Sequence, residues 1–344
     1  MNNKVIALLI ASVCSCASEN RNIEITEYRD VEWTVLEKYE NCFNPDTEYN
    51  RRESYETYGS PRLLQADCYG VVYTLNRGRD LDIKPGLGAC DKYGNVIWEV
   101  NNVSDYSVES MCIKGETVLA FTIDDVQRIR EYDRQTGNLL CTVEPELPES
   151  DRDDGIKIYE ISTDGSTLYG TSMFDVKTVF ALNQEYQLID QLTGDLNRSV
   201  SEDIYTLCNS DTDLFLGALH GDRVYRIAVD GTKTDTLQFG YRELRPILLT
   251  NDGIPLIVSE VIQDICYEDG ALWAVIGGCA FPSDSSEIWR VDLNTNTATV
   301  IPVSESVLSL AVERDTIYIT TAEVKYESDN TEVSGETCLY MGIL

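Results

Sequence analysis

The sequence contains a single histidine, and this limits the chemistry that its side chains could perform. His220 lies in a predicted turn, in the segment Leu219-His220-Gly221-Asp222. A Ser/His/Asp triad needs a histidine beside a serine nucleophile, and the sequence has no Gly-x-Ser-x-Gly elbow to supply one. A metal site built from three histidines is excluded. We therefore predict no catalytic residues, and we interpret His220 as an exposed turn residue that could contact a ligand.

Aspartates recur in a series of predicted loops along the chain. Their charge could attract a cationic ligand, although aspartate is also common in turns for conformational reasons. The longest insertion carries Tyr241, Arg242 and Arg245 at its base, and the two arginines are unusual cations in so acidic a chain. The candidate ligand-binding loop residues are therefore Asp80, Asp82, Asp124, Asp125, Asp175, His220, Asp222, Tyr241, Arg242 and Arg245, and Asp284 belongs to the same series of acidic loops.

Two acidic runs could bind calcium. They cover residues 149–155 and 209–213, and both combine aspartate with serine or asparagine. Neither has the spacing of an EF-hand loop, which needs glycine at position six and glutamate at position twelve. A solvated acidic turn is the alternative for each run. We predict no cofactor from these patterns, and calcium is the one metal that they leave open.

The net charge excludes two classes of partner. The chain has 59 Asp and Glu against 27 Lys and Arg, for a formal net charge of −32, and the acidic residues are spread along its length. A dispersed negative surface repels both nucleic acid and anionic membrane surfaces. The charge therefore favours solubility, with a cationic ligand as the alternative interpretation.

The N-terminus has the pattern of an export signal. Residues 5–11 are apolar and follow Lys4, and this run is too short to span a bilayer. The next residues, Val13-Cys14-Ser15-Cys16, resemble a bacterial lipobox in which Cys16 is lipidated; ordinary cleavage near Ala17 is the alternative. The resemblance implies passage to the outer membrane, because Ala17 and Ser18 follow Cys16 and no aspartate stands at the second position of the mature lipoprotein. We predict a signal peptide over residues 1–15, a lipidated cysteine and tether over 16–28, and one folded domain over 29–344.

That domain repeats a unit of four predicted strands. The clearest copy has an apolar strand, an Asp-Gly turn and an aromatic strand in residues 264–276, followed by two strands around an Asn-rich turn in 287–301. The central apolar residues of the second strands are Val72, Val118, Leu168, Leu214, Leu272 and Ile317, with successive differences of 46, 50, 46, 58 and 45. A period in the high forties with four strands per unit is typical of a β-propeller.

The repeats predict an all-β fold, a six-bladed β-propeller. The sixth copy supplies three strands before the sequence ends, and residues 31–36 alternate well enough to supply the fourth. We therefore expect the last blade to be closed by an N-terminal strand, with Trp33 near Tyr340. The pattern resembles the six-bladed β-propeller lipoproteins of Gram-negative bacteria, which are distantly similar to NHL and TolB-type propellers.

The resemblance implies a location at the cell envelope and leaves the ligand open. We predict a binding module that takes an envelope protein, a glycan or a small ligand at its loop face, and that touches the membrane only through its lipid anchor. The alternative is a calcium-dependent hydrolase or lactonase of the six-bladed propeller class.

Two further features bear on packing. Cys68, Cys112, Cys208 and Cys266 fall in predicted first strands, where Ile161 and Ala311 occupy the same place in the other repeats, so we interpret them as buried thiols. Residues 247–258 place two apolar runs around Asn-Asp-Gly and predict an inserted hairpin. The hairpin could be a packed extension of the blades or a docking element for a partner.

Overall fold

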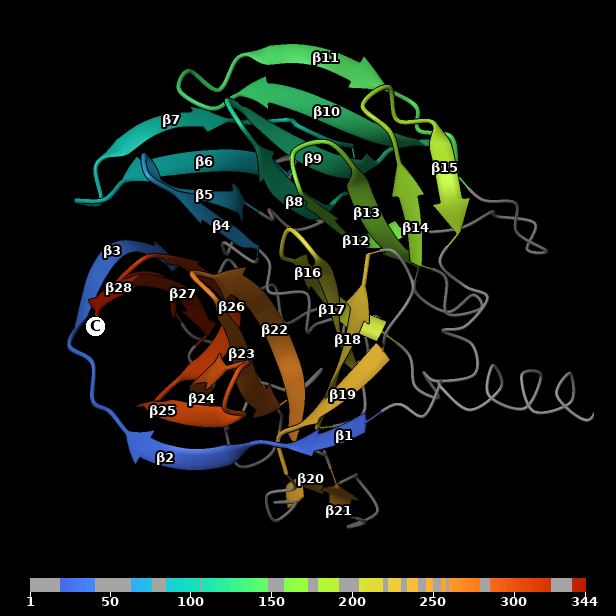
Figure 1. Cartoon of the computed structure of the whole chain (residues 1–344). Helices are drawn as coiled ribbons and strands as arrows, with labels where there is room; N and C mark the ends of the chain where they lie inside the picture. The colour runs from blue at the N-terminus through green and yellow to red at the C-terminus, as the bar shows by residue number, and fades with distance from the viewer. Residues whose placement is uncertain are drawn as a thin grey trace, which may run out of the picture.

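The structure is a computed structural model, and all of its regular secondary structure is β-strand. It describes residues 19–40, 63–75, 85–105, 107–147, 158–172, 179–191, 204–218, 222–229, 234–240, 246–249, 255–257, 260–278, 285–322 and 336–344. Six of its sheets stand radially around a common axis, as Figure 1 shows, so the predicted six-bladed β-propeller is confirmed.

Each of the first three blades is a four-stranded antiparallel meander. Within each blade the strands follow one another from the axis outward in chain order, because short turns pair each strand with the next. Blade 1 contains β4 (Leu64–Asp67), β5 (Gly70–Leu75), β6 (Gly86–Asp91) and β7 (Val96–Val100). Blade 2 contains β8 (Ser107–Lys114), β9 (Thr117–Ile123), β10 (Gln127–Asp133) and β11 (Leu139–Val143). Blade 3 contains β12 (Ile158–Thr163), β13 (Leu168–Ser172), β14 (Val179–Leu182) and β15 (Leu188–Gln191).

The last three blades each take one strand from the N-terminal segment. Blade 4 contains β16 (Ile204–Asn209), β17 (Asp213–Ala218), β18 (Arg223–Ala228) and β19 (Thr234–Gln238), with β1 (Glu19–Asn22) as a fifth strand. Blade 5 contains β22 (Glu260–Glu268), β23 (Ala271–Gly278), β24 (Ser286–Asp292) and β25 (Thr297–Val303), with β2 (Glu24–Tyr28) as a fifth strand. Blade 6 contains β26 (Ser306–Glu313), β27 (Thr316–Ala322), β28 (Glu336–Ile343) and β3 (Trp33–Glu40).

The pairing of β3 with β28 closes the ring. The two strands are antiparallel, with Gly342 opposite Trp33 and Tyr340 opposite Val35. This pairing confirms the expectation that an N-terminal strand completes the last blade. A ring of blades needs such closure, because an open ring would leave two hydrophobic blade faces and two strand edges bare.

The segment before β3 runs along the outer edges of blades 4 and 5. β1 and β2 pair with β19 and β25, and both pairings are parallel. Ile23 and Ile25 from this segment pack against the buried cluster between those two blades. We call β1 and β2 the strap. Residues 19–28, which the sequence analysis assigned to a tether, therefore include two strands held against the propeller (Figure 1).

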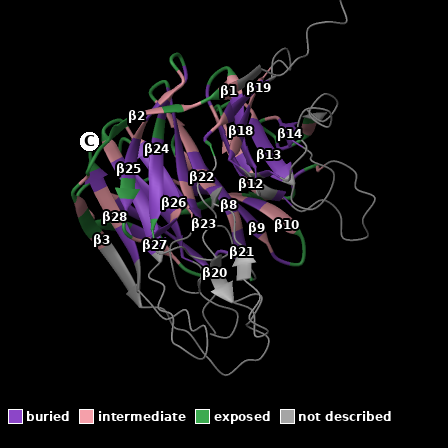
Figure 2. Cartoon of the chain, turned by 90° about the horizontal axis from the view of Figure 1, so that it is seen from below, coloured by how far each residue is buried: buried purple, intermediate pink, exposed green. Residues whose placement is uncertain are grey.

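The hydrophobic core is divided among the boundaries between blades. The described residues form six buried clusters, and each joins two neighbouring blades. The cluster between blades 6 and 1 contains Tyr318 and Leu339 from blade 6 beside Val71 and Tyr73 from blade 1, so the ring is closed by packing as well as by pairing. Figure 2 shows that burial extends along the strands of the blades, whereas exposed residues gather at the turns and on the strap.

A turn of blade 2 fixes the boundary between blades 1 and 2. Gly137 has a φ of 69°, and a Cβ atom there would lie 2.7 Å from the ring of Trp98 in blade 1. The Trp98 Nε1 donates a hydrogen bond of 2.9 Å to the carbonyl of Arg134. The buried Arg134 guanidinium in turn makes two bonds of 2.8 Å to the carboxylate of Asp67 in blade 1. The aromatic ring therefore needs a residue without a side chain at position 137.

The register corrects two details of the predicted repeat. Val118, Leu168, Leu214, Leu272 and Ile317 occupy the same position in their second strands, but the equivalent residue of blade 1 is Val71, not Val72. Cys68 lies in the turn after β4 and is exposed, so its prediction as a buried first-strand thiol was wrong. The turn of blade 1 begins one residue earlier in the repeat than the sequence pattern suggested.

The insertion between blades 4 and 5 contains the predicted hairpin. β20 (Pro246–Leu249) and β21 (Pro255–Ile257) form a separate antiparallel pair with Leu248 opposite Leu256. Among the described residues, the structure has no helix that is long and apolar enough to cross a membrane.

Two truncations separate the roles of the strap and the closing strand. Removal of residues 19–28 deletes the strap but leaves four strands in every blade, so we expect a folded ring that is about 2–4 kcal/mol less stable through loss of Ile23 and Ile25. Removal of residues 19–40 also deletes β3, and we expect loss of the cooperative unfolding transition because the edge of β28 is then bare. Circular dichroism melting measures both, and equal effects of the two truncations would contradict this account.

Candidate functional site

Five of the six inner strands carry a β-bulge at the same place in their register. The inner strands β4, β8, β12, β16, β22 and β26 surround the axis (Figure 1). A bulge adds one residue to a strand, so that the local alternation of side chains is interrupted. We call the bulged residues the axial ring, and they are Glu109, Tyr159, Tyr205, Gln263 and Leu308.

Three members of the axial ring are more exposed than the residue that precedes each of them in its strand. Glu109 is partly exposed, whereas Val108 and Ser110 on either side of it are 1% and 2% exposed. Gln263 and Leu308 are partly exposed as well. An inner strand has a blade on each flank and its own sheet behind it, so the remaining open direction is the axis. We infer that these side chains line the mouth of the axial channel.

The axial ring lies at one end of the propeller. Each bulge is close to the start of its inner strand, and that start pairs with the end of the second strand, as in Ser107 opposite Ile123 and Glu260 opposite Gly278. The loops that join second and third strands begin at these same strand ends. The predicted loop face and the axial ring are therefore at the same end of the molecule.

The residue that follows each bulge connects its blade to a neighbour. The Ser110 Oγ accepts a hydrogen bond of 2.9 Å from the amide of Ile161 in blade 3, and the Glu160 Oε2 accepts one of 3.1 Å from the amide of Leu207 in blade 4. These bonds satisfy backbone donors of the inner strands that face no strand partner. We call these residues the girdle: Ser110, Glu160, Thr206, Asp264 and Ser309.

Asp264 is the most heavily bonded member of the girdle. Its carboxylate accepts hydrogen bonds from the Thr206 hydroxyl at 3.2 Å and the Ser309 hydroxyl at 2.7 Å. It also accepts bonds from the amides of Ile265 and Leu310, both at 2.8 Å. Asp264 therefore joins blades 4, 5 and 6. Burial disfavours the charged form and raises the pKa of Asp264 to about 6, although these hydrogen bonds act in the opposite direction.

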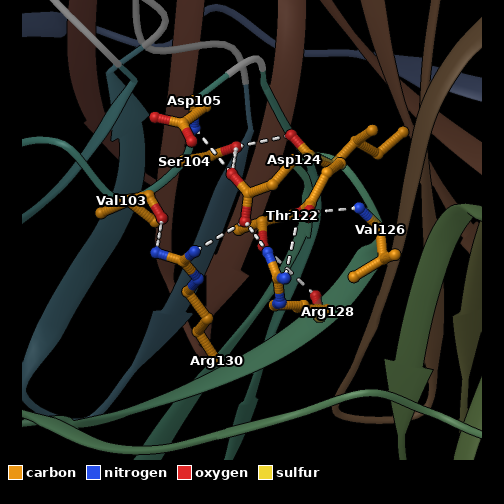
Figure 3. A network of polar contacts seen from close by, with 10 residues as sticks. Val103, Ser104, Asp105, Thr122, Asp124, Val126, Arg128 and Arg130 are labelled. Atoms are coloured by element: carbon orange, nitrogen blue, oxygen red, sulfur yellow. Dashed lines mark hydrogen bonds and ion pairs between the residues drawn. The ribbon is translucent and has the colours of Figure 1, made fainter.

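Asp124, a predicted ligand residue, is bonded within the protein (Figure 3). Its carboxylate is bonded to the Arg128 Nη1 at 2.9 Å and to the Arg130 Nη2 at 2.7 Å. It also accepts hydrogen bonds from the Ser104 hydroxyl at 2.9 Å and the Asp105 amide at 2.7 Å. Burial opposes its charge, but these hydrogen bonds and the nearby charge of Arg130 hold the pKa of Asp124 below its usual value. The Asp124 carboxylate is thus neutralised by two guanidinium groups of its own blade.

Two other predicted loop residues are described, and they differ in burial. The side chain of Asp125 is 80% exposed and lies 3.0 Å from the Arg128 Nη2. Asp222 is only 6% exposed, and its carboxylate has no hydrogen-bond donor among the residues that the structure describes. These three aspartates look alike in sequence but differ in the structure. Asp124 is buried and bonded to two arginines, Asp125 is exposed and paired with one, and the carboxylate of Asp222 is buried without a hydrogen bond.

The remaining predicted site residues lie outside the described residues. They are Cys16, Asp80, Asp82, Asp175, His220, Tyr241, Arg242, Arg245 and Asp284. Of the two acidic runs considered for calcium, residues 149–155 also lie outside them. In the other run, the Asp213 carboxylate bonds to the Arg226 Nη2 at 2.8 Å. Within the described part of the chain, no three His, Cys, Asp or Glu side chains are grouped to hold a metal ion.

The sequence analysis missed the axial ring and the girdle. Their signal is present in the repeat, because each axial-ring residue stands nine positions before the apolar marker of its blade, as Gln263 does before Leu272. The residues at this offset share no chemical type, so a search by composition does not reveal them. The nine-residue spacing identifies these residues only once the structure shows that a bulge occurs there.

Three of the four predicted thiols do lie in inner strands, each directly after a buried apolar residue. Cys112 and Cys208 are buried, and Cys266 is partly buried. Burial raises the pKa of Cys112 to about 12, and it also raises the pKa values of Cys208 and Cys266 well above the usual value. These cysteines therefore act as small apolar residues at the blade boundaries.

Comparison with solved structures bears on the fold alone. The chain is similar to U3-55K, with 12% identity over 91% of this chain and 98% of that chain and a TM-score of 0.55. It also matches a glutaminyl cyclase from Myxococcus xanthus, with 14% identity over 69% and 91% of the two chains and a TM-score of 0.41. A protein of Bacteroides fragilis described only provisionally as exported matches at 11% identity over 94% and 100%, with a TM-score of 0.49. No protein-family model and no curated protein sequence matches the chain.

The raised pKa of Asp264 predicts a specific pH dependence. Its folded pKa of about 6 lies above the usual aspartate pKa of 3.8, so the folded state binds this proton more tightly. The resulting stabilisation is complete below about pH 4 and is lost as the pH rises through about 6. We expect the free energy of unfolding of the wild type, relative to that of Asp264→Asn, to fall by about 2–3 kcal/mol between pH 4 and pH 7. Urea titrations across this range measure the difference, and a constant difference would contradict the prediction.

Proposed function

We propose that this chain is an exported, lipid-anchored propeller that binds a ligand over the axial ring. The observation that carries the proposal is that Glu109, Gln263 and Leu308, which share the bulge position of three inner strands, are each partly exposed next to a buried preceding residue. Two hydrogen-bonding side chains and one apolar side chain at a common mouth are the mixture that small-ligand and glycan sites use. The ligand is an envelope protein, a glycan or a small molecule.

The rigidity of the inner strands supports a binding role. Each girdle bond ties an inner strand to its neighbour, so the axial-ring positions are held by backbone that is bonded on both sides. Such preorganisation lowers the entropic cost of binding, because the site does not have to be ordered by the ligand. Glu109, Gln263 and Leu308 also come from three different blades, which is typical of sites at the mouth of a closed β-structure.

Localisation at the cell envelope is supported by the N-terminal pattern. The lipobox-like segment ending at Cys16 places the lipid three residues before Glu19, where β1 begins. Mass spectrometry of the membrane fraction, before and after substitution of Cys16 by serine, tests the lipid anchor. Loss of membrane association in Cys16→Ser supports it, and an unmodified wild-type N-terminus that begins elsewhere contradicts it.

Site-specific photocrosslinking tests binding at the axial ring. A photoreactive amino acid at position 263 is compared in intact cells with the same amino acid at position 135, since Gln135 is an exposed glutamine in a turn at the opposite end of the propeller. We expect a discrete crosslinked species from position 263 alone. Equal crosslinking from both positions, or none from position 263, would overturn the proposal.

Matched substitutions give the energetic test for the ligand so identified. Gln263→Leu and Glu109→Gln change the axial ring, whereas Gln135→Leu and Glu116→Gln make the same changes at exposed positions of the opposite end. We expect each change of the first pair to weaken binding about five- to tenfold, because Gln263→Leu loses a hydrogen bond and Glu109→Gln loses a charged acceptor, each worth about 1–1.5 kcal/mol, and the second pair to leave binding unchanged. Isothermal titration calorimetry measures the dissociation constants. Repeating it with calcium and with EDTA tests the alternative, a calcium-dependent hydrolase or lactonase.

A further inference from the structure

A buried aspartate at the boundary of blades 4 and 5 has no hydrogen bond to its carboxylate. Asp222 is 6% exposed, and neither the Oδ1 nor the Oδ2 has a donor among the residues that the structure describes. The Arg223 Nε lies 4.0 Å from the Oδ1, which is beyond hydrogen-bond distance. The backbone of Asp222 is fixed, because its carbonyl accepts a bond of 2.8 Å from the amide of Phe239. The backbone of Asp222 is thus held in place, while its carboxylate has a long ion pair and no hydrogen bond.

The equivalent residues in two other blades each accept a hydrogen bond from the next blade. The strand register aligns Asp222 with Gln127 of blade 2 and Ser286 of blade 5. The Gln127 Oε1 accepts a hydrogen bond of 3.0 Å from the amide of Ile158, at the start of the next inner strand. The Ser286 Oγ accepts one of 2.9 Å from the amide of Val307 in the same way. In blades 2 and 5 this position therefore supplies a side-chain acceptor for the next blade.

Blade 4 departs from this pattern. The amide equivalent to those of Ile158 and Val307 belongs to Ile262, and the Asp222 carboxylate accepts no bond from it. The hairpin of β20 and β21 is inserted between these blades, between Gln238 and Glu260. Blade 4 thus carries a charged acceptor at this position, and the chain that leads from it to blade 5 contains the inserted hairpin.

A buried carboxylate that accepts no hydrogen bond and has one cation at the limit of ion-pair distance is costly, so it requires an explanation. Desolvation of a lone ionised group costs several kcal/mol even after relaxation, and proteins keep such groups mainly where they are used. Asp124 is the contrasting case, a buried carboxylate that the protein itself neutralises. Arg128 and Arg130 both bond to it. Asp222 has no comparable pair of cations among the described residues.

We propose that Asp222 binds the cationic group of the ligand, an ammonium or a guanidinium, at the boundary of blades 4 and 5. A single carboxylate fits such a group, since charge-assisted hydrogen bonds to an organic cation need only one anionic partner. Calcium would need six to eight oxygen ligands. The net charge of −32 raises the local concentration of cations around the whole chain. This proposal rests on the proposed function and names the chemical class of its ligand.

The first test compares two buried aspartates in the unliganded protein. Asp222→Asn removes an unsatisfied charge, so we expect its melting temperature to be equal to or higher than that of the wild type. Asp124→Asn removes the partner of two arginines, so we expect its melting temperature to fall by several degrees, corresponding to a loss of bonds to charged groups. Differential scanning calorimetry measures both. A fall for Asp222→Asn that matches that of Asp124→Asn, or a failure of Asp222→Asn to fold, would overturn the proposal.

The second test uses a charged probe and its neutral counterpart. N-acetylarginine amide and N-acetylcitrulline amide have nearly the same shape, but only the first is cationic at neutral pH. We expect wild type to bind the arginine probe at least tenfold more tightly, Asp222→Asn to lose this preference, and Asp125→Asn to keep it as the control on an exposed aspartate. Nuclear magnetic resonance titration measures the affinities. A preference that survives in Asp222→Asn, or its absence in the wild type, would overturn the proposal.

These outcomes are distinguishable from failure of the proposed function. Photocrosslinking from position 263 reports whether anything binds at the axial ring, and it does not depend on the charge of the ligand. Crosslinking without a charge preference overturns the role of Asp222 alone. A charge preference at Asp222 without crosslinking from position 263 overturns the axial-ring site and leaves a separate cation site at blades 4 and 5.

Discussion

Closure of the ring is the constraint on which the remaining structure depends. Every blade buries both of its faces against neighbours, so the first and last blades must also find each other. The pairing of β3 with β28 and the packing of Tyr73 against the blade 6 cluster meet this requirement together. Once the ring is closed, the inner strands are held at fixed distances around the axis. The girdle bonds between neighbouring inner strands are possible only in that arrangement.

Backbone amides that find no hydrogen-bond acceptor within their own blade gather on the inner strands, around the axis. Inner strands have one strand neighbour, so half of their amides need other acceptors, and the girdle residues supply several of them. The bulge just before each girdle residue adds one residue to the strand, and three of these added residues are partly exposed. The bulge and the girdle bond thus lie side by side in the same strands. A binding site at this place needs no additional scaffold.

Much of the fold could be predicted because burial imposes a period on the sequence. Leu214 and Leu272 mark their blades correctly, since alternation and Asp-Gly turns are local signals. Blade 1 was misaligned by one residue because its first turn, at Cys68, lacks such a signal.

The candidate site was less predictable from the sequence than the fold. Asp124 and Asp222 look the same in sequence, and only the position of two arginines on β10 and the lack of a donor near Asp222 distinguish them.

The strap has a consequence for how the chain is made. β1, β2 and β3 are synthesised first, but their partners are β19, β25 and β28, and Trp33 pairs with Gly342 near the end of the sequence. Contacts so distant along the chain form slowly, because a very long loop must close before they stabilise anything. A nascent chain emerging N-terminus first can therefore assemble its middle blades but cannot complete the propeller until its final strand has been released. Until then, the leading segment needs protection from proteases and from aggregation.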